Sequence, residues 1–145
     1  MGRSALFSGA KLGKSAMLFH LCGIMYEEKL FAVQFISSEQ ALSQAAFGSL
    51  LIDVRTAEEV THRAFDVANL THLPYADLKQ HFQDLPTDKP IIFVCKTGKR
   101  SQRAAAYLAF KGHPDVSNLV GGIVAWEKAG FPVIKGRGKE GCCTI

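Results

Sequence analysis

A chain of 145 residues with 48% hydrophobic residues can form one domain with a substantial apolar core. No stretch reaches the roughly 18 to 20 apolar residues of a membrane span, so we expect a soluble protein with no membrane partner. The net charge of +4 is unevenly distributed, because residues 89–111 contain six Lys and Arg residues and no carboxylate. This segment favours a small anionic ligand. No motif with interleaved aromatic and basic residues is present, so no nucleic-acid partner is expected.

The four cysteines do not suggest a disulfide framework, because Cys142 and Cys143 are adjacent and Cys22 lies in an N-terminal extension. A reducing compartment is therefore the default, and the predicted location is cytoplasmic. No pair of CxxC motifs is present, so no metal site is predicted.

Three regions are predicted from the composition along the chain. Residues 1–29 form an extension that is disordered or weakly ordered, residues 30–135 form the domain, and residues 136–145 form a flexible tail. Residues 1–25 are basic and then apolar, without the cleavage site of a signal peptide. A targeting segment and an overlong start, with Met25 as the natural first residue, are the alternatives for this stretch.

The domain begins with alternating strand and helix patterns. Residues 30–36, LFAVQFI, predict a strand. Ser37, followed three residues later by Gln40, predicts a capping box for a helix that ends near Gly48. The short apolar run at residues 50–54, LLIDV, predicts a strand buried on both faces.

The middle of the chain repeats this alternation. Thr56 is a candidate N-cap for a helix in the segment TAEEVTHRA. The segment LTHLP predicts a short strand that Pro74 ends. Residues 76–85 place Leu78, Phe82 and Leu85 on one face of a predicted helix.

The last third contains the most apolar elements. The segment PIIFVC predicts a buried strand that ends near Cys95, and residues 101–112 predict a helix. The segments that follow are a strand at VSNLV, a turn at Gly121 and Gly122, and a helix at IVAWEKAG. The remainder reads as a polar tail after a last apolar anchor. These alternating elements predict an α/β fold with three α/β/α layers and a mostly parallel central sheet of about five strands. Right-handed crossovers place Cys95 at the carboxyl end of a central strand, where such sheets bind ligands.

Cys95 is the candidate catalytic nucleophile. A thiol between a strand and a helix lies near inward-pointing amides and the positive end of the helix dipole, which lower a thiol pKa. Gly98 allows the loop to take a positive φ, so that successive amides surround one centre. Lys96, Lys99 and Arg100 add the charge that attracts a dianion.

Two chemistries share this design, attack on phosphorus and attack on sulfur. Tyrosine-type phosphatases use C-x5-R, whereas here Ser101 occupies the sixth position after Cys95 and Arg100 comes one residue earlier. A shorter loop makes a smaller cradle, which suits sulfane sulfur better than a phosphoryl group. A phosphatase also needs a general acid, for which Asp53 and Asp66 are the candidates. A cysteine-dependent phosphatase is kept as an alternative.

Three segments carry a resemblance to a known family. The loop CKTGKRS resembles the active-site loop of the rhodanese (sulfurtransferase) family, and LLIDVRTAEE and NLVGGIVAWEKAGFPV resemble two further signatures of that family. The resemblance covers roughly residues 32–134 and implies the rhodanese-like fold. The segment FDVANLTHLP departs from the usual GHIxGAxNIP, because it lacks both glycines and the histidine.

The resemblance implies a sulfurtransferase that works through a Cys95 persulfide without a further cofactor. Its partners would be a small anionic sulfur donor such as thiosulfate and an acceptor, which is cyanide, a thiol or the cysteine of an acceptor protein. The active-site loop that would hold donor and persulfide comprises Lys96, Thr97, Gly98, Lys99, Arg100 and Ser101.

Three further points belong to this reading. Asp53 and Arg55 either brace the loop or form a structural pair. Cys142 and Cys143 are a candidate arm for relaying sulfur to or from Cys95. The alternative of another class is a regulatory rhodanese module, without catalysis, that docks a partner.

Overall fold

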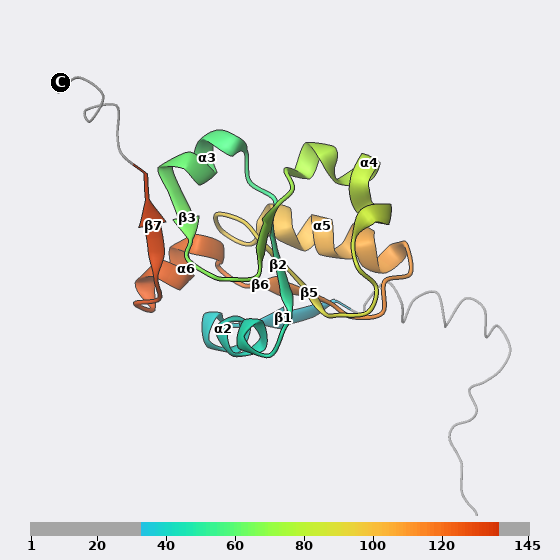
Figure 1. Cartoon of the computed structure of the whole chain (residues 1–145), viewed down its shortest axis with the longest axis horizontal. Helices are drawn as coiled ribbons and strands as arrows, with labels where there is room; N and C mark the ends of the chain where they lie inside the picture. The colour runs from blue at the N-terminus through green and yellow to red at the C-terminus, as the bar shows by residue number, and fades with distance from the viewer. Residues whose placement is uncertain (1–32, 137–145) are drawn as a thin grey trace, which may run out of the picture.

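The computed structural model describes residues 33–136 (Figure 1). The predicted extension at residues 1–29 and residues 137–145 of the predicted tail lie outside the described residues. Cys142 and Cys143 also lie outside the described residues, so their role in relaying sulfur stays a prediction. None of the helices within the described range is long and apolar enough to cross a membrane.

A five-stranded sheet forms the centre of the fold, in the order β1-β6-β5-β2-β4. Every neighbouring pair in this sheet is parallel. The predicted α/β architecture is therefore confirmed, and β5 is the middle strand. The strands are β1 Gln34–Ile36, β2 Leu50–Asp53, β4 Leu70–His72, β5 Ile91–Val94 and β6 Val116–Leu119.

Alternate side chains of β5 enter two separate cores, because successive strand residues point to opposite faces. Ile92 and Val94 pack on the side of α2 and α6. Ile91, Phe93 and then Cys95 pack on the side of α4 and α5. Figure 1 shows α2 and α5 on opposite sides of the sheet. These helices are α2 Ser38–Ala46, α4 Leu78–His81, α5 Lys99–Phe110 and α6 Gly122–Lys128.

Two helices begin with complete capping boxes. The Ser37 side chain accepts from the Gln40 amide, and the Gln40 side chain accepts from the Ser37 amide, as predicted. Helix α3, Ala57–His62, begins at the predicted N-cap Thr56, and its reciprocal partner is Glu59. Both helices therefore start where local side-chain chemistry satisfies their first amides.

One predicted helix is broken into three short pieces. Residues 76–85 form parts of the 3₁₀ turns η3 Tyr75–Asp77 and η4 Phe82–Asp84, with α4 between them. No side chain caps any of these pieces. A segment this short is marginal as a free helix. Its shape follows instead from packing on α5, where Phe82 meets Tyr107 edge to face with ring centroids 5.6 Å apart.

A second, two-stranded sheet was not predicted. β3, Arg63–Phe65, pairs antiparallel with β7, Val133–Lys135, in segments predicted as the end of a helix and as the last apolar stretch before the tail. The Glu127 carboxylate bonds to Arg63 and pairs with Lys135, which holds both strands beside α6. Because each strand has three residues, neither shows a usable alternation pattern, and only the long-range pairing defines them.

Candidate active site

Cys95 directly follows β5 and is 1% exposed. The chain turns at Gly98, which has a φ of 97° and is the N-cap of α5. A Cβ at Gly98 would approach Gly121 N to 3.1 Å and Leu119 O to 3.2 Å, in addition to the cost of the positive φ. Cys95 thus lies where the sequence predicted it, at the carboxyl end of a central strand and before a helix.

Two backbone amides and one hydroxyl surround the Cys95 sulfur. The Gly98 amide donates to Sγ over 3.1 Å and the Ser101 amide over 3.4 Å, and the Ser101 hydroxyl lies 3.2 Å away. Burial acts to raise the pKa of the thiol, but hydrogen bonds from the Ser101 hydroxyl and the amides of Ser101, Gly98 and Thr97 outweigh it, and the pKa is lowered. The site therefore favours a negative charge on this sulfur.

The Ser101 hydroxyl also contacts Asn118 on β6, over 2.6 Å to Oδ1. Both residues are buried. A hydroxyl carries one proton, so Ser101 donates either to the Asn118 oxygen or to the Cys95 sulfur. When the sulfur is a thiolate and accepts a hydrogen bond from the Ser101 hydroxyl, the Asn118 amide must turn to present its nitrogen to Ser101. The orientation of the Asn118 amide therefore decides whether the Ser101 hydroxyl donates to the Cys95 sulfur or to Asn118.

Helix α6 clamps the backbone of the active-site loop. The Ile123 amide donates to the Cys95 carbonyl over 2.8 Å, and the Val124 amide donates to the Lys96 carbonyl over 3.2 Å. Gly122, with a φ of 57°, makes this approach feasible, because a Cβ there would lie 2.3 Å from Cys95 O and 2.5 Å from Lys96 O. The glycine pair predicted only as a turn thus belongs to the site.

Arg100 forms a two-pronged ion pair with Glu59. Nη1 and Nη2 each donate to one carboxylate oxygen over 2.7 Å. This hydrogen bonding, opposed in part by desolvation, lowers the pKa of Glu59 to about 2. Sequence analysis expects Arg100 to bind the anion of a donor. In the structure each terminal nitrogen uses one N–H for Glu59, and the pair connects the start of α5 with α3.

Asp53 and Arg55 form a buried pair at the end of β2. Arg55 Nη2 donates to Asp53 Oδ2 over 2.6 Å, and Nε donates to Oδ1 over 2.9 Å. The side chains are 1% and 3% exposed. His72 Nε2 donates to the Arg55 carbonyl over 2.7 Å. The pair holds the strand end, and Asp53 is not free to act as a general acid.

The remaining side chains of the active-site loop are exposed, namely those of Lys96, Thr97 and Lys99. Asp66 is exposed as well, and no contact within residues 33–136 ties it to the thiol.

Sequence reasoning did not single out Glu59, Asn118 or Gly122. Their signals were available but weak: the third position of a capping box, a polar residue inside an apolar strand, and a glycine pair.

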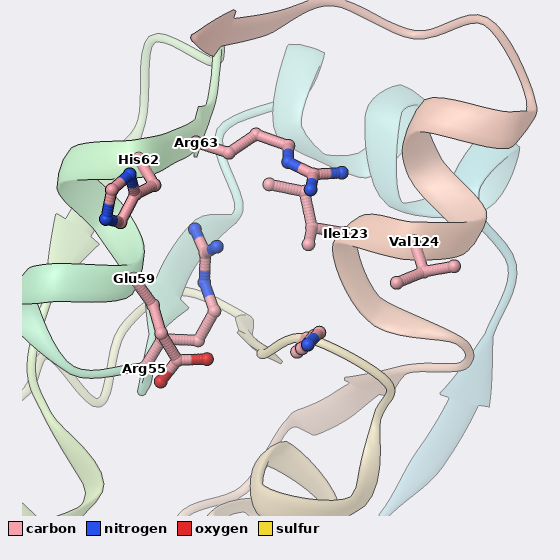
Figure 2. A pocket seen from close by; sticks show the side chains of 7 residues that line it. Arg55, Glu59, His62, Arg63, Ile123 and Val124 are labelled. Carbon is pink, nitrogen blue, oxygen red and sulfur yellow. The ribbon is translucent and has the colours of Figure 1, made fainter. Parts of the chain in front are cut away.

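A cavity of about 160 Å³ lies beside the loop (Figure 2). Its wall is formed by residues of α3, β3, the active-site loop and the first turn of α6, together with one arginine after β2. The lining residues are Arg55, Glu59, His62, Arg63, Lys96, Ile123 and Val124.

The family model for the rhodanese-like domain matches residues 37–129. A protein named sulfurtransferase from Allochromatium vinosum is 34% identical over 89 residues, which cover 61% of this chain and 81% of that protein. A thiosulfate sulfurtransferase GlpE from Pseudomonas savastanoi is 35% identical over 97 residues, which cover 67% of this chain and 89% of the relative.

A solved structure agrees with this assignment. The crystal structure of a rhodanese-related protein from Thermoplasma volcanium has a TM-score of 0.62 and 28% identity, and the match covers 70% of this chain and 97% of that one. The signatures around Cys95, the parallel five-stranded sheet and the family match lead to one conclusion: the chain belongs to the rhodanese-like domain family.

Proposed function

We propose that the protein is a sulfurtransferase that carries sulfane sulfur as a persulfide on Cys95. The observation that supports it most is the buried Cys95 sulfur, with the Gly98 amide, the Ser101 amide and the Ser101 hydroxyl directed at it. The two amides already point at the sulfur and stabilise an anion on it without reorganisation, and the Ser101 hydroxyl adds a third hydrogen bond once the Asn118 amide has turned. Relatives named sulfurtransferases share about a third of their aligned residues with this chain.

The first half-reaction loads the enzyme. The Cys95 thiolate attacks the outer sulfur of thiosulfate and forms a new S–S bond. The original S–S bond of the donor breaks, and sulfite leaves with the bonding electrons. Lys96 and Lys99, both exposed beside the loop, attract the donor dianion electrostatically. The enzyme then holds one sulfur atom as Cys95–S–S⁻.

The second half-reaction unloads it. A thiophilic acceptor (cyanide, a thiolate or the cysteine of an acceptor protein) attacks the outer sulfur. The persulfide bond breaks, and Cys95 leaves as a thiolate. The loop amides from Lys96 to Ser101 stabilise the negative sulfur in both steps. Because the donor product departs before the acceptor reacts, ping-pong kinetics are expected.

Arg100 and Arg55 are assigned positioning roles in this scheme. Arg100 is bound by Glu59, and Arg55 by Asp53, so each charge is balanced by a neighbouring carboxylate. Both pairs hold segments that adjoin the loop, namely the start of α5 and the end of β2.

The test is the mass of the protein after incubation with thiosulfate. We expect a gain of about 32 Da, one sulfur atom, that cyanide removes as thiocyanate and that the Cys95→Ser variant never acquires. The absence of both the mass gain and the thiocyanate release would overturn the sulfurtransferase proposal and favour a docking module without catalysis. Turnover of an aryl phosphate above the Cys95→Ser background would instead support the phosphatase alternative.

A further inference from the structure

We propose that Val124 is a positioning residue for the sulfur chemistry of Cys95 and that it acts through its backbone amide. By holding the Lys96 carbonyl, this amide turns the Thr97 N–H group toward the sulfur, where it stabilises the thiolate and the persulfide anion. The inference rests on the proposed function, because it names a residue outside the active-site loop on which the persulfide depends.

The first amides of α6 are available to the loop because no side chain caps this helix. Its N-cap is Gly121, which makes no side-chain hydrogen bond. The first N–H groups of a helix have no partner within the helix. Two of them bind the loop instead: the Ile123 amide donates to the Cys95 carbonyl over 2.8 Å, and the Val124 amide donates to the Lys96 carbonyl over 3.2 Å. Figure 2 shows both residues on the first turn of α6.

The hydrogen bond from Val124 decides which way the Thr97 amide points. Every peptide bond within the described residues is trans, so a carbonyl and the N–H group of the next residue point in opposite directions. The Lys96 carbonyl points toward α6, and the Thr97 N–H group therefore points away from it. The Cys95 side chain packs on the α4 and α5 side of the sheet, whereas Trp126 of α6 packs on the other side. The Thr97 amide thus faces the side on which the sulfur lies.

The Thr97 amide is one of the groups that stabilise the charged sulfur. Burial raises the pKa of Cys95, but it is outweighed by hydrogen bonds from the Ser101 hydroxyl and from the amides of Ser101, Gly98 and Thr97. Ser101 belongs to α5 and Gly98 is the N-cap of that helix, so α5 itself fixes these two residues. Thr97 precedes the helix, and the direction of its amide depends on the loop.

Side-chain packing does not hold the peptide between Lys96 and Thr97. Both of these side chains are exposed, whereas Cys95 is 1% exposed. If this peptide turned over, the Lys96 carbonyl oxygen would face the sulfur in place of the Thr97 N–H group. A carbonyl oxygen carries a partial negative charge, which would destabilise an anion on the sulfur. The hydrogen bond from Val124 opposes this turn.

Helix α6 can hold the loop because the helix is itself firmly anchored. Trp126, one turn after Ile123, is fully buried, and its Nε1 donates to the Pro132 carbonyl over 2.9 Å. Its ring meets the Phe65 ring of β3 edge to face, with centroids 5.4 Å apart. One carboxylate of α6 also pairs with a residue on each strand of the two-stranded sheet. The first turn of α6 is therefore a fixed support for the loop carbonyls.

Val124→Pro tests the role of this amide. Proline lacks the N–H group and is tolerated in the first turn of a helix. Alkylation by iodoacetamide is followed at Cys95 by peptide mass, since the chain has four cysteines. We expect the midpoint of the alkylation rate to lie at a higher pH than in the unmodified protein. The gain of about 32 Da from thiosulfate should be about 10-fold slower at pH 7, because less Cys95 is then a thiolate.

Two further proteins separate the N–H group from other effects of proline. Glu39→Pro is the matched control, because it places a proline in the first turn of α2, which packs in the same core as α6. It should keep the midpoint and the loading rate of the unmodified protein. In the second protein the α-hydroxy acid of valine replaces Val124, so that an ester removes the N–H group and keeps the side chain. This protein should behave as Val124→Pro does.

The fluorescence of Trp126, the single Trp of the chain, reports whether α6 remains packed. If its emission shifts in Val124→Pro, the ester protein decides. An unchanged midpoint or an unchanged loading rate in the ester protein would overturn the positioning role. Equal changes in Glu39→Pro would overturn it too. An unmodified protein that gains no sulfur from thiosulfate contradicts the proposed function instead, and the midpoint of alkylation still tests Val124.

Discussion

The Arg100 guanidinium and the Glu59 carboxylate face each other in two parallel hydrogen bonds, each 2.7 Å long. Glu59 also accepts from the Thr56 amide and closes the capping box of α3. One carboxylate thus fixes the start of α3 and binds the first turn of α5, which begins at the active-site loop. Arg100, which is expected to bind the donor, thus also links α3 to the active-site loop.

Replacing Glu59 with Gln tests this ion pair. Gln can still serve the capping box, as Gln40 does in α2, so the change removes mainly the charge that faces Arg100. We expect the free energy of unfolding at pH 7 to fall by about 1 kcal/mol, since the pair is about one third exposed and partly screened.

The pH dependence of the unfolding free energy gives a second test with the same variant. The pKa of Glu59 is lowered to about 2 in the folded protein, so the stabilisation is complete above the unfolded value near 4.5 and is lost as the pH falls toward 2. Urea unfolding at several pH values measures the difference between the two proteins. That difference should shrink below pH 4.5, and a constant difference down to pH 2 would contradict the assignment.

The Cys95 thiol should react as a thiolate at a lower pH than a free thiol does. Its pKa is lowered, because the hydrogen bonds from Ser101, Gly98 and Thr97 outweigh the effect of burial. The rate of alkylation by iodoacetamide should rise with pH and level off at a lower pH than for an unstructured cysteine peptide. A midpoint at or above that of the peptide would show that the donors do not stabilise the anion.

Asn118→Asp should raise the pKa of Cys95. A carboxylate at this position accepts a hydrogen bond from the Ser101 hydroxyl, cannot donate one in return, and adds a negative charge near the sulfur. The pH profile of alkylation reports the shift. Ser117→Ala is the control, because it changes a buried polar residue next in β6 that has no side-chain bond to Ser101. An unchanged midpoint in Asn118→Asp would remove Asn118 from the site.

Gly122→Ala should distort the active-site loop. The new Cβ would lie 2.3 Å from Cys95 O and 2.5 Å from Lys96 O, so the backbone must move. We expect a loss of at least about 2 kcal/mol in unfolding free energy and slower alkylation of Cys95. Gly130→Ala is the comparison, since Gly130 also has a positive φ but open space around it. It should cost about 1 to 2 kcal/mol and leave the thiol unaffected. Equal effects in the two variants would mean that backbone strain alone explains Gly122.

Local patterns predicted most of the fold because most elements carry their own signals. The apolar runs that became β2 and β5 are short and bounded by polar residues, and the cap at Ser37 sits one residue before α2. The exceptions are segments whose structure depends on a distant partner. β3 and β7 exist because they pair with each other, and the turns around α4 follow the surface of α5.

The sequence by itself determined that Cys95 lies in a glycine-containing, basic loop between a buried strand and a helix, because strand, turn and helix signals are local. Only the tertiary structure decided which groups face that loop. Glu59 binds Arg100, Asn118 binds Ser101, and Gly122 packs on the Cys95 carbonyl. These residues lie far along the chain from the loop residues that they contact. Parallel strands and crossover helices bring their ends to one edge of the sheet, and that juxtaposition has no local sequence signal.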